Sequence, residues 1–190
     1  MVLGLARGGV PVAFEIARAL GAPLDVFVVR KLGVPAQPEL GMGAIAEGGA
    51  RVVNREMVAE AGVSDDEMAA VEARERVELE RRAALYRDGR APADLTGRVV
   101  IVVDDGLATG GTARAAVEGV RNRGARTIVL AVPIAARETI AALAREVDDI
   151  VCVEAPRHLR AVGEWYRDFS PTTDAEVLAL LELSRPDGSP

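Results

Sequence analysis

One segment of the sequence constrains the fold of this chain more than any other. Residues 99–103 are five consecutive apolar residues, and two carboxylates, Asp104 and Asp105, follow them directly, before a turn rich in glycine and threonine. The apolar run contains only valine and isoleucine, which is typical of a strand covered on both faces. Residues 112–123 then have the character of a helix that stops at Gly124. A buried strand that leads through a turn into a helix is part of a βαβ unit, so this segment predicts a parallel sheet.

The rest of the chain repeats this alternation of short apolar runs and amphipathic segments. The alternation predicts an α/β protein with a Rossmann-like parallel sheet flanked by helices. Pro11 in the first turn and Gly21 after the last turn favour a helix over residues 10–20. We expect strands at residues 2–6, 25–29, 99–103, 127–132 and 150–153, and helices at residues 10–20, 112–123, 137–147 and 174–183.

The middle of the chain, residues 34–97, breaks this rhythm and is interpreted as an insertion. Residues 41–47 and 51–53 have the pattern of a β-hairpin joined by two glycines. A capping-box pattern at Ser64 opens a helix that ends near Arg87. This helix has a thin apolar stripe and oppositely charged residues four positions apart, so we expect it to be mostly solvated and to lie over the sheet edge. A spacer or a contact between subunits would explain such a helix equally well.

Composition and length bound the class of protein. The 190 residues suffice for one domain, residues 1–190, with residues 184–190 expected as a frayed tail. No apolar run approaches the roughly 20 residues of a membrane span, and the N-terminus lacks a secretory signal, so we expect a cytoplasmic protein. The one cysteine, Cys152, allows no intramolecular disulfide and is expected to be a small buried residue. A net charge of −6 argues against a nucleic-acid partner, although a local site can still hold a small phosphorylated ligand.

The turn after residues 99–103 has the residues of an anion-binding loop. Glycines let successive backbone N–H groups converge on a phosphate, threonine hydroxyls add donors, and the helix N-terminus contributes partial positive charge. The paired carboxylates suit the cis hydroxyls of a ribose, with Mg²⁺ close by. The segment therefore predicts a sugar-phosphate site formed by Asp104, Asp105, Gly106, Leu107, Ala108, Thr109, Gly110, Gly111 and Thr112.

Two other phosphate-binding patterns do not fit this sequence. No Gly-Lys-Ser/Thr closes the turn, and the single lysine, Lys31, is far away, so there is no Walker motif. Gly4, Gly8 and Gly9 lack the spacing of the dinucleotide-binding fingerprint. A nucleotide-sugar or NAD-binding module is therefore a weak alternative.

Residues 99–113 resemble the signature with which type I phosphoribosyltransferases bind 5-phosphoribosyl-1-pyrophosphate (PRPP). The resemblance implies the type I fold with a flap and a C-terminal hood. It also implies that Asp104 and Asp105 hold the ribose hydroxyls near Mg²⁺, and that residues 108–112 surround the 5-phosphate.

A second loop agrees with this resemblance. Ala6, Arg7, Gly8 and Gly9 follow the first strand and are similar to the family's pyrophosphate loop, where backbone amides and a basic side chain meet the diphosphate. The family often has a non-proline cis peptide in this loop, and we expect it at Ala6-Arg7. The resemblance covers most of the chain and is most specific in residues 99–113.

Two further segments are candidates for contact with the substrates. The hood candidate, residues 156–171, contains Trp165 and Tyr166, either of which could stack on a base, although packing onto the sheet would explain the same residues. The flap candidate is residues 34–49, whose glycines could permit closure over the substrate.

The charged pair Arg30 and Lys31 is expected to end the second strand at the edge of the sheet where ligands gather. There it could meet pyrophosphate or the base. A solvated strand end would explain the same pair.

The resemblance implies transfer of the 5-phosphoribosyl group of PRPP to a nitrogenous base, with Arg7 and Mg²⁺ stabilising the leaving pyrophosphate. Ala108 stands where hypoxanthine-guanine enzymes carry an aspartate, and residues 107–112 are closer to adenine and uracil enzymes. Residues 7–9, however, resemble the loop of xanthine-guanine enzymes, so the base, purine or pyrimidine, stays open.

A bacterial subgroup of uncertain acceptor is also similar to this chain, in residues 30–33, 39–41, 44–46 and 163–166. The alternative function is a regulatory protein that senses PRPP without turning it over. A homodimer is expected. The sequence begins directly at the first strand, whereas relatives usually have a helix before it, so we expect that helix to be absent or the start to be late.

Overall fold

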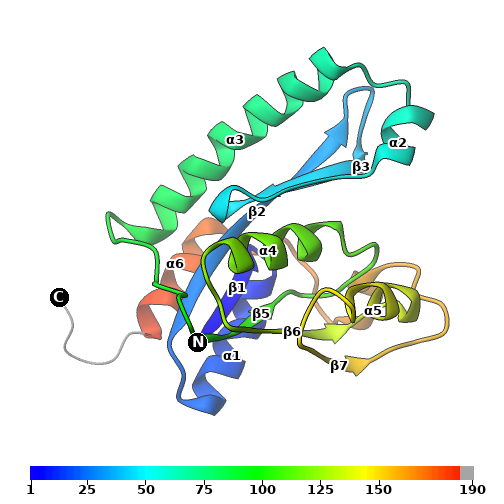
Figure 1. Cartoon of the computed structure of the whole chain (residues 1–190). Coiled ribbons are helices and arrows are strands. Elements are labelled where there is room, and N and C mark those ends of the chain that lie inside the picture. Colours follow the sequence, from blue (N-terminus) through cyan, green and yellow to red (C-terminus); the bar gives the residue numbers. More distant parts are fainter. Residues whose placement is uncertain (185–190) are drawn as a thin grey trace.

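The structure, a computed structural model, describes residues 1–184 and shows an α/β protein built on one sheet (Figure 1). The strand order is β4-β3-β2-β1-β5-β6-β7; β3 pairs antiparallel with both β2 and β4, and the other neighbouring pairs are parallel. The strands are β1 (Val2–Ala6), β2 (Leu24–Val34), β3 (Gln37–Ala46), β4 (Arg51–Val53), β5 (Val99–Val103), β6 (Thr127–Ile134) and β7 (Asp149–Glu154). The helices are α1 (Gly9–Leu20), α2 (Arg55–Glu60), α3 (Asp65–Arg87), α4 (Gly111–Asn122), α5 (Arg137–Leu143) and α6 (Asp174–Leu183), with short 3-10 helices η1 (Glu47–Gly49) and η2 (Val162–Trp165). The predicted fold class, a mostly parallel sheet flanked by helices, is confirmed.

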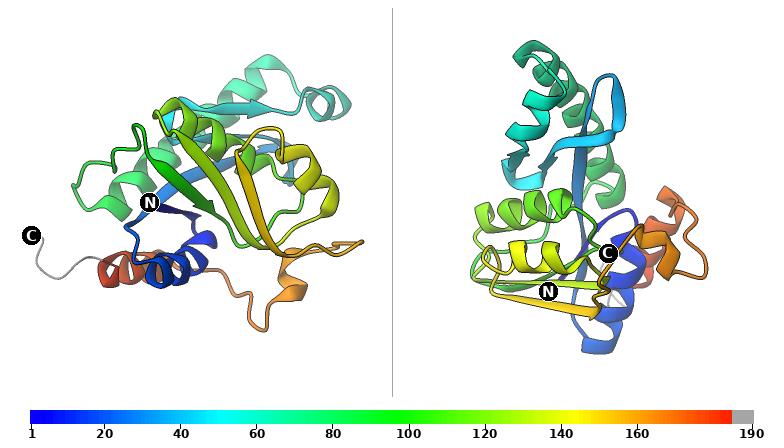
Figure 2. Two further views of the ribbon diagram at one scale, coloured as in Figure 1. Left: turned by 60° about the horizontal axis from the view of Figure 1, so that its bottom comes forward. Right: turned by 90° about the vertical axis from the view of Figure 1, so that its right-hand side faces the viewer.

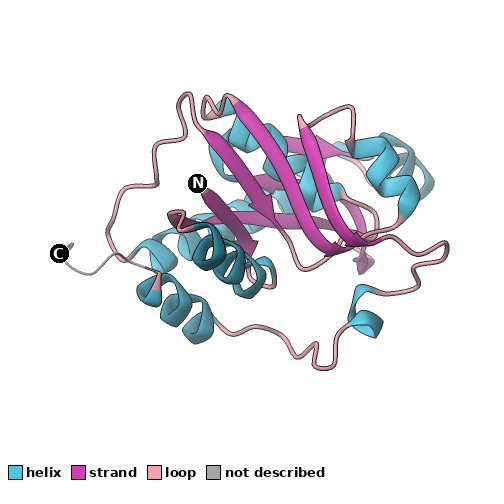
Figure 3. Ribbon diagram, turned by 90° about the horizontal axis from the view of Figure 1, so that it is seen from below, coloured by secondary structure: helices cyan, strands magenta, loops and turns pink. Residues whose placement is uncertain are grey.

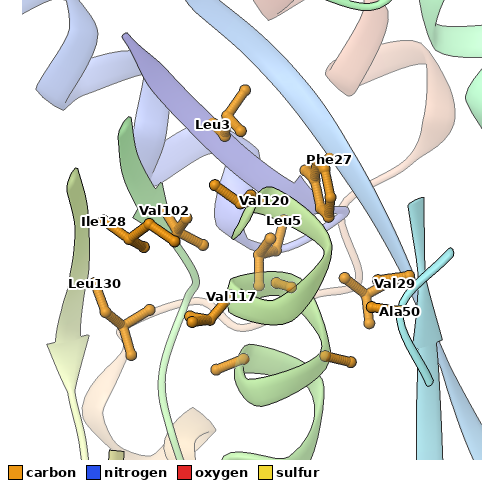
Figure 4. Close-up of a cluster of buried hydrophobic side chains, with 14 of the residues drawn as sticks. Leu3, Leu5, Phe27, Val29, Ala50, Val102, Val117, Val120, Ile128 and Leu130 are labelled. Atoms are coloured by element: carbon orange, nitrogen blue, oxygen red, sulfur yellow. The ribbon is translucent and has the colours of Figure 1, made fainter. Parts of the chain in front are cut away.

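Helices cover both faces of the sheet (Figure 2). On one face, α4 places Val117 and Val120 against apolar side chains of β1, β2, β5 and β6 (Figure 4). On the other face, α1 packs against β1, β5 and β6 through Ala13 and Ala17. A Cβ atom at Gly4 would lie 2.8 Å from the Cα of Val10, so glycine lets α1 approach β1 closely. The apolar strands are therefore buried on both sides, as a parallel sheet requires.

The second strand is longer than predicted, and this is the main correction to the sequence analysis. β2 continues from Leu24 to Val34 and pairs with β3, so the two strands form an arm that extends beyond the other strands (Figure 1). The predicted hairpin is confirmed as β3 and β4, but β3 begins at Gln37 rather than at residue 41. The extra strand length is stable because Leu32 and Val34 are buried in one cluster with residues of α3.

Helix α3 begins at the predicted capping box of Ser64 and Glu67 and ends at Arg87. Its apolar stripe, including Met68 and Val71, is buried against the face of β2, so the helix is packed more firmly than the prediction of a solvated helix over the sheet edge. Ion pairs at the predicted spacing flank this stripe: Arg76, whose side chain is 47% exposed, pairs with Glu72, whereas Arg82, which is 17% exposed, pairs with Glu78.

Smaller differences concern helix ends and Cys152. Helix α2 was not predicted. Helix α5 ends at Leu143 rather than at residue 147, and beyond its end Glu146 pairs with Arg114 of α4. Cys152 is half-buried rather than buried, since β7 is the last strand of the sheet. No helix among residues 1–184 is long and apolar enough to cross a membrane. The predicted tail falls, apart from Ser184, outside the described residues.

Candidate active site

The site lies at the topological switch point of the sheet, between the neighbouring strands β1 and β5. β1 and β5 are parallel neighbours, and the helices that follow them, α1 and α4, lie on opposite faces. Loops leave these two strands at their carboxyl ends (Figure 3), and residues of both loops line a crevice there. This is the place where open α/β sheets bind their ligands. Both loops singled out in the sequence border this crevice.

The loop after β1 is shaped by two glycines and a cis peptide. The Ala6-Arg7 peptide bond is cis, as predicted. A Cβ atom at Gly8 would overlap the Oδ2 atom of Asp105, and one at Gly9 would overlap the carbonyl oxygen at the end of β5. Only glycine permits this approach, so the loop after β1 lies directly against the carboxylate pair.

The two carboxylates follow β5 and lie close together. The backbone N–H of Asp105 donates a hydrogen bond to Asp104 Oδ1 at 3.0 Å. Burial, together with the neighbouring charge of Asp105, raises the pKa of Asp104 to about 8, and burial also raises the pKa of Asp105. Neither carboxylate has an ion-pair partner among residues 1–184. The pair therefore offers several hydrogen-bond acceptors side by side, and no positively charged side chain among residues 1–184 forms an ion pair with them.

The turn between β5 and α4 leaves donors free at the start of a helix. Gly110 adopts a left-handed conformation with φ of 75°, and within the described chain no side chain caps α4. The first amides of α4 thus remain available to an anion, and the helix dipole favours negative charge there. Helix α5 holds this turn in place, because the hydroxyl of Thr139 donates to the carbonyl oxygen of Ala108 at 2.5 Å.

These elements enclose a cavity of about 330 Å³. Every residue predicted to bind PRPP lines this cavity except Gly9 and Gly111. Gly9 lies against the end of β5, and Gly111 borders an adjacent cleft. Val162 of η2 also lines the cavity, and its side chain lies where a Cβ atom of Gly106 would be. No local pattern in the sequence marks Val162, because only the fold brings it over the turn. The cavity is lined by Leu5, Ala6, Arg7, Gly8, Val29, Asp104, Asp105, Gly106, Leu107, Ala108, Thr109, Gly110, Thr112 and Val162.

The predicted charged pair of β2 lies outside this cavity. Because β2 runs on to Val34, Arg30 and Lys31 do not end a strand, and the Arg30 guanidinium instead pairs with Glu75 of α3 at 2.6 Å. Lys31 borders an adjoining cleft of about 800 Å³ between the arm and α4, which shares Thr109 and Thr112 with the cavity. The prediction that the pair ends β2 is therefore wrong.

The two aromatic residues of the predicted hood also lie outside the cavity of about 330 Å³. Trp165 is 49% exposed. Tyr166 lines a neighbouring pocket of about 490 Å³, and its hydroxyl donates to the carbonyl oxygen of Asp105 at 2.6 Å. Burial raises the pKa of Tyr166 to about 12, so the hydroxyl keeps its proton and remains a donor.

The carboxylate pair fits a magnesium ion that is shared with a substrate. No cluster of three or more His, Cys, Asp or Glu side chains suited to a metal occurs among residues 1–184. Mg²⁺ is commonly held by only one or two carboxylates, with water and substrate oxygens completing its shell. Asp104 and Asp105, with raised pKa values and no cationic partner, have the character of such a partial site.

The fold and the crevice define the class of this protein: an α/β protein whose ligand site lies at the topological switch point. The sequence model of the family described as “Phosphoribosyl transferase domain” matches residues 1–162. The chain therefore belongs to the phosphoribosyl transferase family, and its fold is the type I phosphoribosyltransferase fold. Membership in this family supports a transferase enzyme.

Individual relatives agree with this assignment. The Mycobacterium tuberculosis protein named “Putative phosphoribosyl transferase Rv0571c” is 51% identical over 187 residues, which are 98% of this chain and 42% of that protein. The chain thus spans less than half of that relative. The crystal structure of TT1426 from Thermus thermophilus has a TM-score of 0.76 at 42% identity and covers 95% of this chain and 85% of that one. A uracil phosphoribosyltransferase of Lactobacillus delbrueckii subsp. bulgaricus is 44% identical over 61 residues, which are 32% of this chain and 29% of that protein.

Proposed function

We propose that this chain transfers the 5-phosphoribosyl group of PRPP to a ring nitrogen of a nitrogenous base and releases pyrophosphate. The observation that carries the proposal is the single cavity in which a carboxylate pair, an uncapped helix N-terminus and an arginine-bearing loop meet. Each of these features suits one part of PRPP: the ribose diol, the 5-phosphate and the diphosphate. The family assignment supports the same reaction.

In this proposal each loop has its own task. Asp104 and Asp105 accept hydrogen bonds from the ribose 2′- and 3′-hydroxyls, and the amides and hydroxyls of residues 108–112 bind the 5-phosphate. As the bond between C1 and the pyrophosphate oxygen breaks, positive charge grows on the ribose ring and negative charge on the pyrophosphate. Arg7 and the amides of its loop stabilise that negative charge. Mg²⁺, held near the carboxylate pair, supplies further charge neutralisation when bound.

The flanking segments complete the proposed site. We assign residues 156–171 as the hood, from which Val162 covers the turn after β5, and residues 34–97 as the flap and its helical insertion. All of these belong, in this proposal, to one phosphoribosyltransferase domain over residues 1–190.

The acceptor is proposed only as a nitrogenous base, with uracil as the first compound to test. The partial match to a uracil phosphoribosyltransferase supports this order, and so does the alanine at position 108 of the phosphate turn. Adenine and the other purines follow in the same panel.

The test measures pyrophosphate release from Mg²⁺-PRPP with each base in turn. Release that depends on one base and disappears in the double variant Asp104→Asn/Asp105→Asn is the expected result. A matched control is Asp149→Asn, since Asp149 also follows another aspartate but lies exposed at the start of β7. Calorimetry with PRPP runs in parallel: binding without release for any base favours the PRPP-sensing alternative, and absence of binding refutes the proposal.

A further inference from the structure

The C-terminal helix touches the loop that carries Arg7. α6 packs beside α1 (Figure 2), and its first residue, Asp174, lies with a carboxylate oxygen 3.6 Å from the Arg7 guanidinium. Both side chains are about one-third exposed, at 33% and 34%. Arg7 pairs with no other acid in the part of the chain that the structure describes.

The carboxylate of Asp174 is fixed independently of Arg7. The hydroxyl of Tyr86, a fully buried residue of α3, donates to Asp174 Oδ1 at 2.6 Å. Burial and this hydrogen bond raise the pKa of Tyr86 to about 12, so the hydroxyl stays protonated. The start of α6 is itself fixed by a capping box between Thr173 and Glu176. A negative charge is therefore held beside Arg7 by two separate elements of the fold.

We propose that Asp174 is a positioning residue that competes with pyrophosphate for Arg7. The inference rests on the proposed function, in which Arg7 meets the diphosphate. A fixed carboxylate beside a guanidinium offsets part of its charge and holds it on the side of α6, so a second anion binds it less tightly. Asp174 thereby weakens the hold on pyrophosphate and favours its departure after transfer. The family match ends at residue 162, so this contact is not part of what the family assignment describes.

The test compares two ligands by titration calorimetry on the full chain. Magnesium pyrophosphate probes the Arg7 loop, and ribose 5-phosphate probes the rest of the cavity without a diphosphate. Asp174→Asn keeps the size of the side chain and removes its charge. We expect the Kd for magnesium pyrophosphate to fall about two- to fivefold, as suits a partly exposed ion pair, while the Kd for ribose 5-phosphate does not change.

Two further variants make the result specific. Glu176→Gln removes a negative charge from the same helical turn and keeps the capping box, because glutamine serves there as well as glutamate; it should leave both affinities unchanged. In an Arg7→Gln background, Asp174→Asn should give no gain for pyrophosphate. Circular dichroism and thermal melting establish that each variant is folded.

The outcomes separate this inference from the proposed function. If the unmodified chain binds neither PRPP nor ribose 5-phosphate, the proposed function fails and this inference fails with it. If both bind but Asp174→Asn leaves pyrophosphate affinity unchanged or weaker, only the role of Asp174 is overturned. An equal gain in Glu176→Gln would also overturn it, because the effect would then be one of overall charge.

Discussion

The buried ion pair between Glu47 and Arg87 is predicted to hold η1 and the end of α3 to β2. Glu47 Oε2 lies 2.6 Å from the Arg87 guanidinium, and Glu47 Oε1 accepts a hydrogen bond from the backbone N–H of Val28 at 2.7 Å. The two side chains are only 9% and 8% exposed. Arg87 also donates to the carbonyl oxygen of Val26, so a single pair joins η1, β2 and the end of α3.

Replacing Glu47 by alanine should therefore cost much more than replacing an exposed acid. The change leaves a buried guanidinium without a counter-charge, which costs about 3–5 kcal/mol, and the Val28 amide without an acceptor. For a chain of this length the expected fall in Tm is roughly 6–20 °C. Urea unfolding followed by circular dichroism measures the free energy of unfolding directly.

Glu78 provides the matched control within α3. It pairs with Arg81 and Arg82, whose hydrogen bonds lower its pKa to about 2, but its side chain is 29% exposed, against 9% for Glu47. Water screens such pairs, so Glu78→Ala should cost at most about 1 kcal/mol. Equal losses for Glu47→Ala and Glu78→Ala would refute the reasoning from burial.

A double variant tests whether the loss in Glu47→Ala comes from the unpaired charge of Arg87. The Nε atom of Arg87 is buried without a hydrogen-bond partner, so the native pair is itself incompletely compensated. Replacing both partners, by Glu47→Leu and Arg87→Met, should recover much of the stability that Glu47→Ala loses, since apolar residues often replace a buried pair at little cost.

Three further predictions concern the cavity. Gly8→Ala should weaken PRPP binding by about tenfold or more in calorimetry, because its Cβ overlaps Asp105. Gly21→Ala, outside the cavity, should lower stability because an alanine is strained at its φ of 57°, but should leave PRPP binding intact. Asp104 holds its proton up to about pH 8 in the folded chain but only to about pH 4 when unfolded, so stability falls as the pH rises between these values. Without Mg²⁺, thermal melting should therefore show Asp104→Asn gaining on the unmodified chain from pH 5 to pH 8, and a constant difference would contradict this. Tyr166→Phe should cost about 1 kcal/mol in urea unfolding, and no loss would mean that its bond to Asp105 contributes nothing.

The parts of the site that the sequence predicted are those whose chemistry is local. In the segment from β5 to α4, strand, carboxylates, glycines and helix are consecutive, and each is recognisable from residue type alone. The loop after β1 is also a run of consecutive residues, and its resemblance to the family's pyrophosphate loop predicted the position of the cis peptide. In these two segments, residues that are neighbours in the sequence are also neighbours in the site, so a local pattern was enough to predict them.

The parts that were missed depend on packing between distant segments. The run of β2 past Arg30 to Val34 is decided by the apolar side of α3, which no local pattern around Lys31 reveals. Val162 reaches the cavity only because η2 folds back over the turn after β5. Asp174 and Tyr86 are 88 residues apart in sequence, so their hydrogen bond could not be inferred from spacing.

The segment beyond residue 162 touches both loops of the cavity, and this bears on how the proposed site is held. Tyr166 donates to the carbonyl of Asp105 in the loop after β5, while Asp174 lies beside Arg7 in the loop after β1. These two loops already contact each other through Gly8 and Asp105, where no side chain could intervene. A shift of the C-terminal segment would therefore move the proposed ribose and pyrophosphate contacts together.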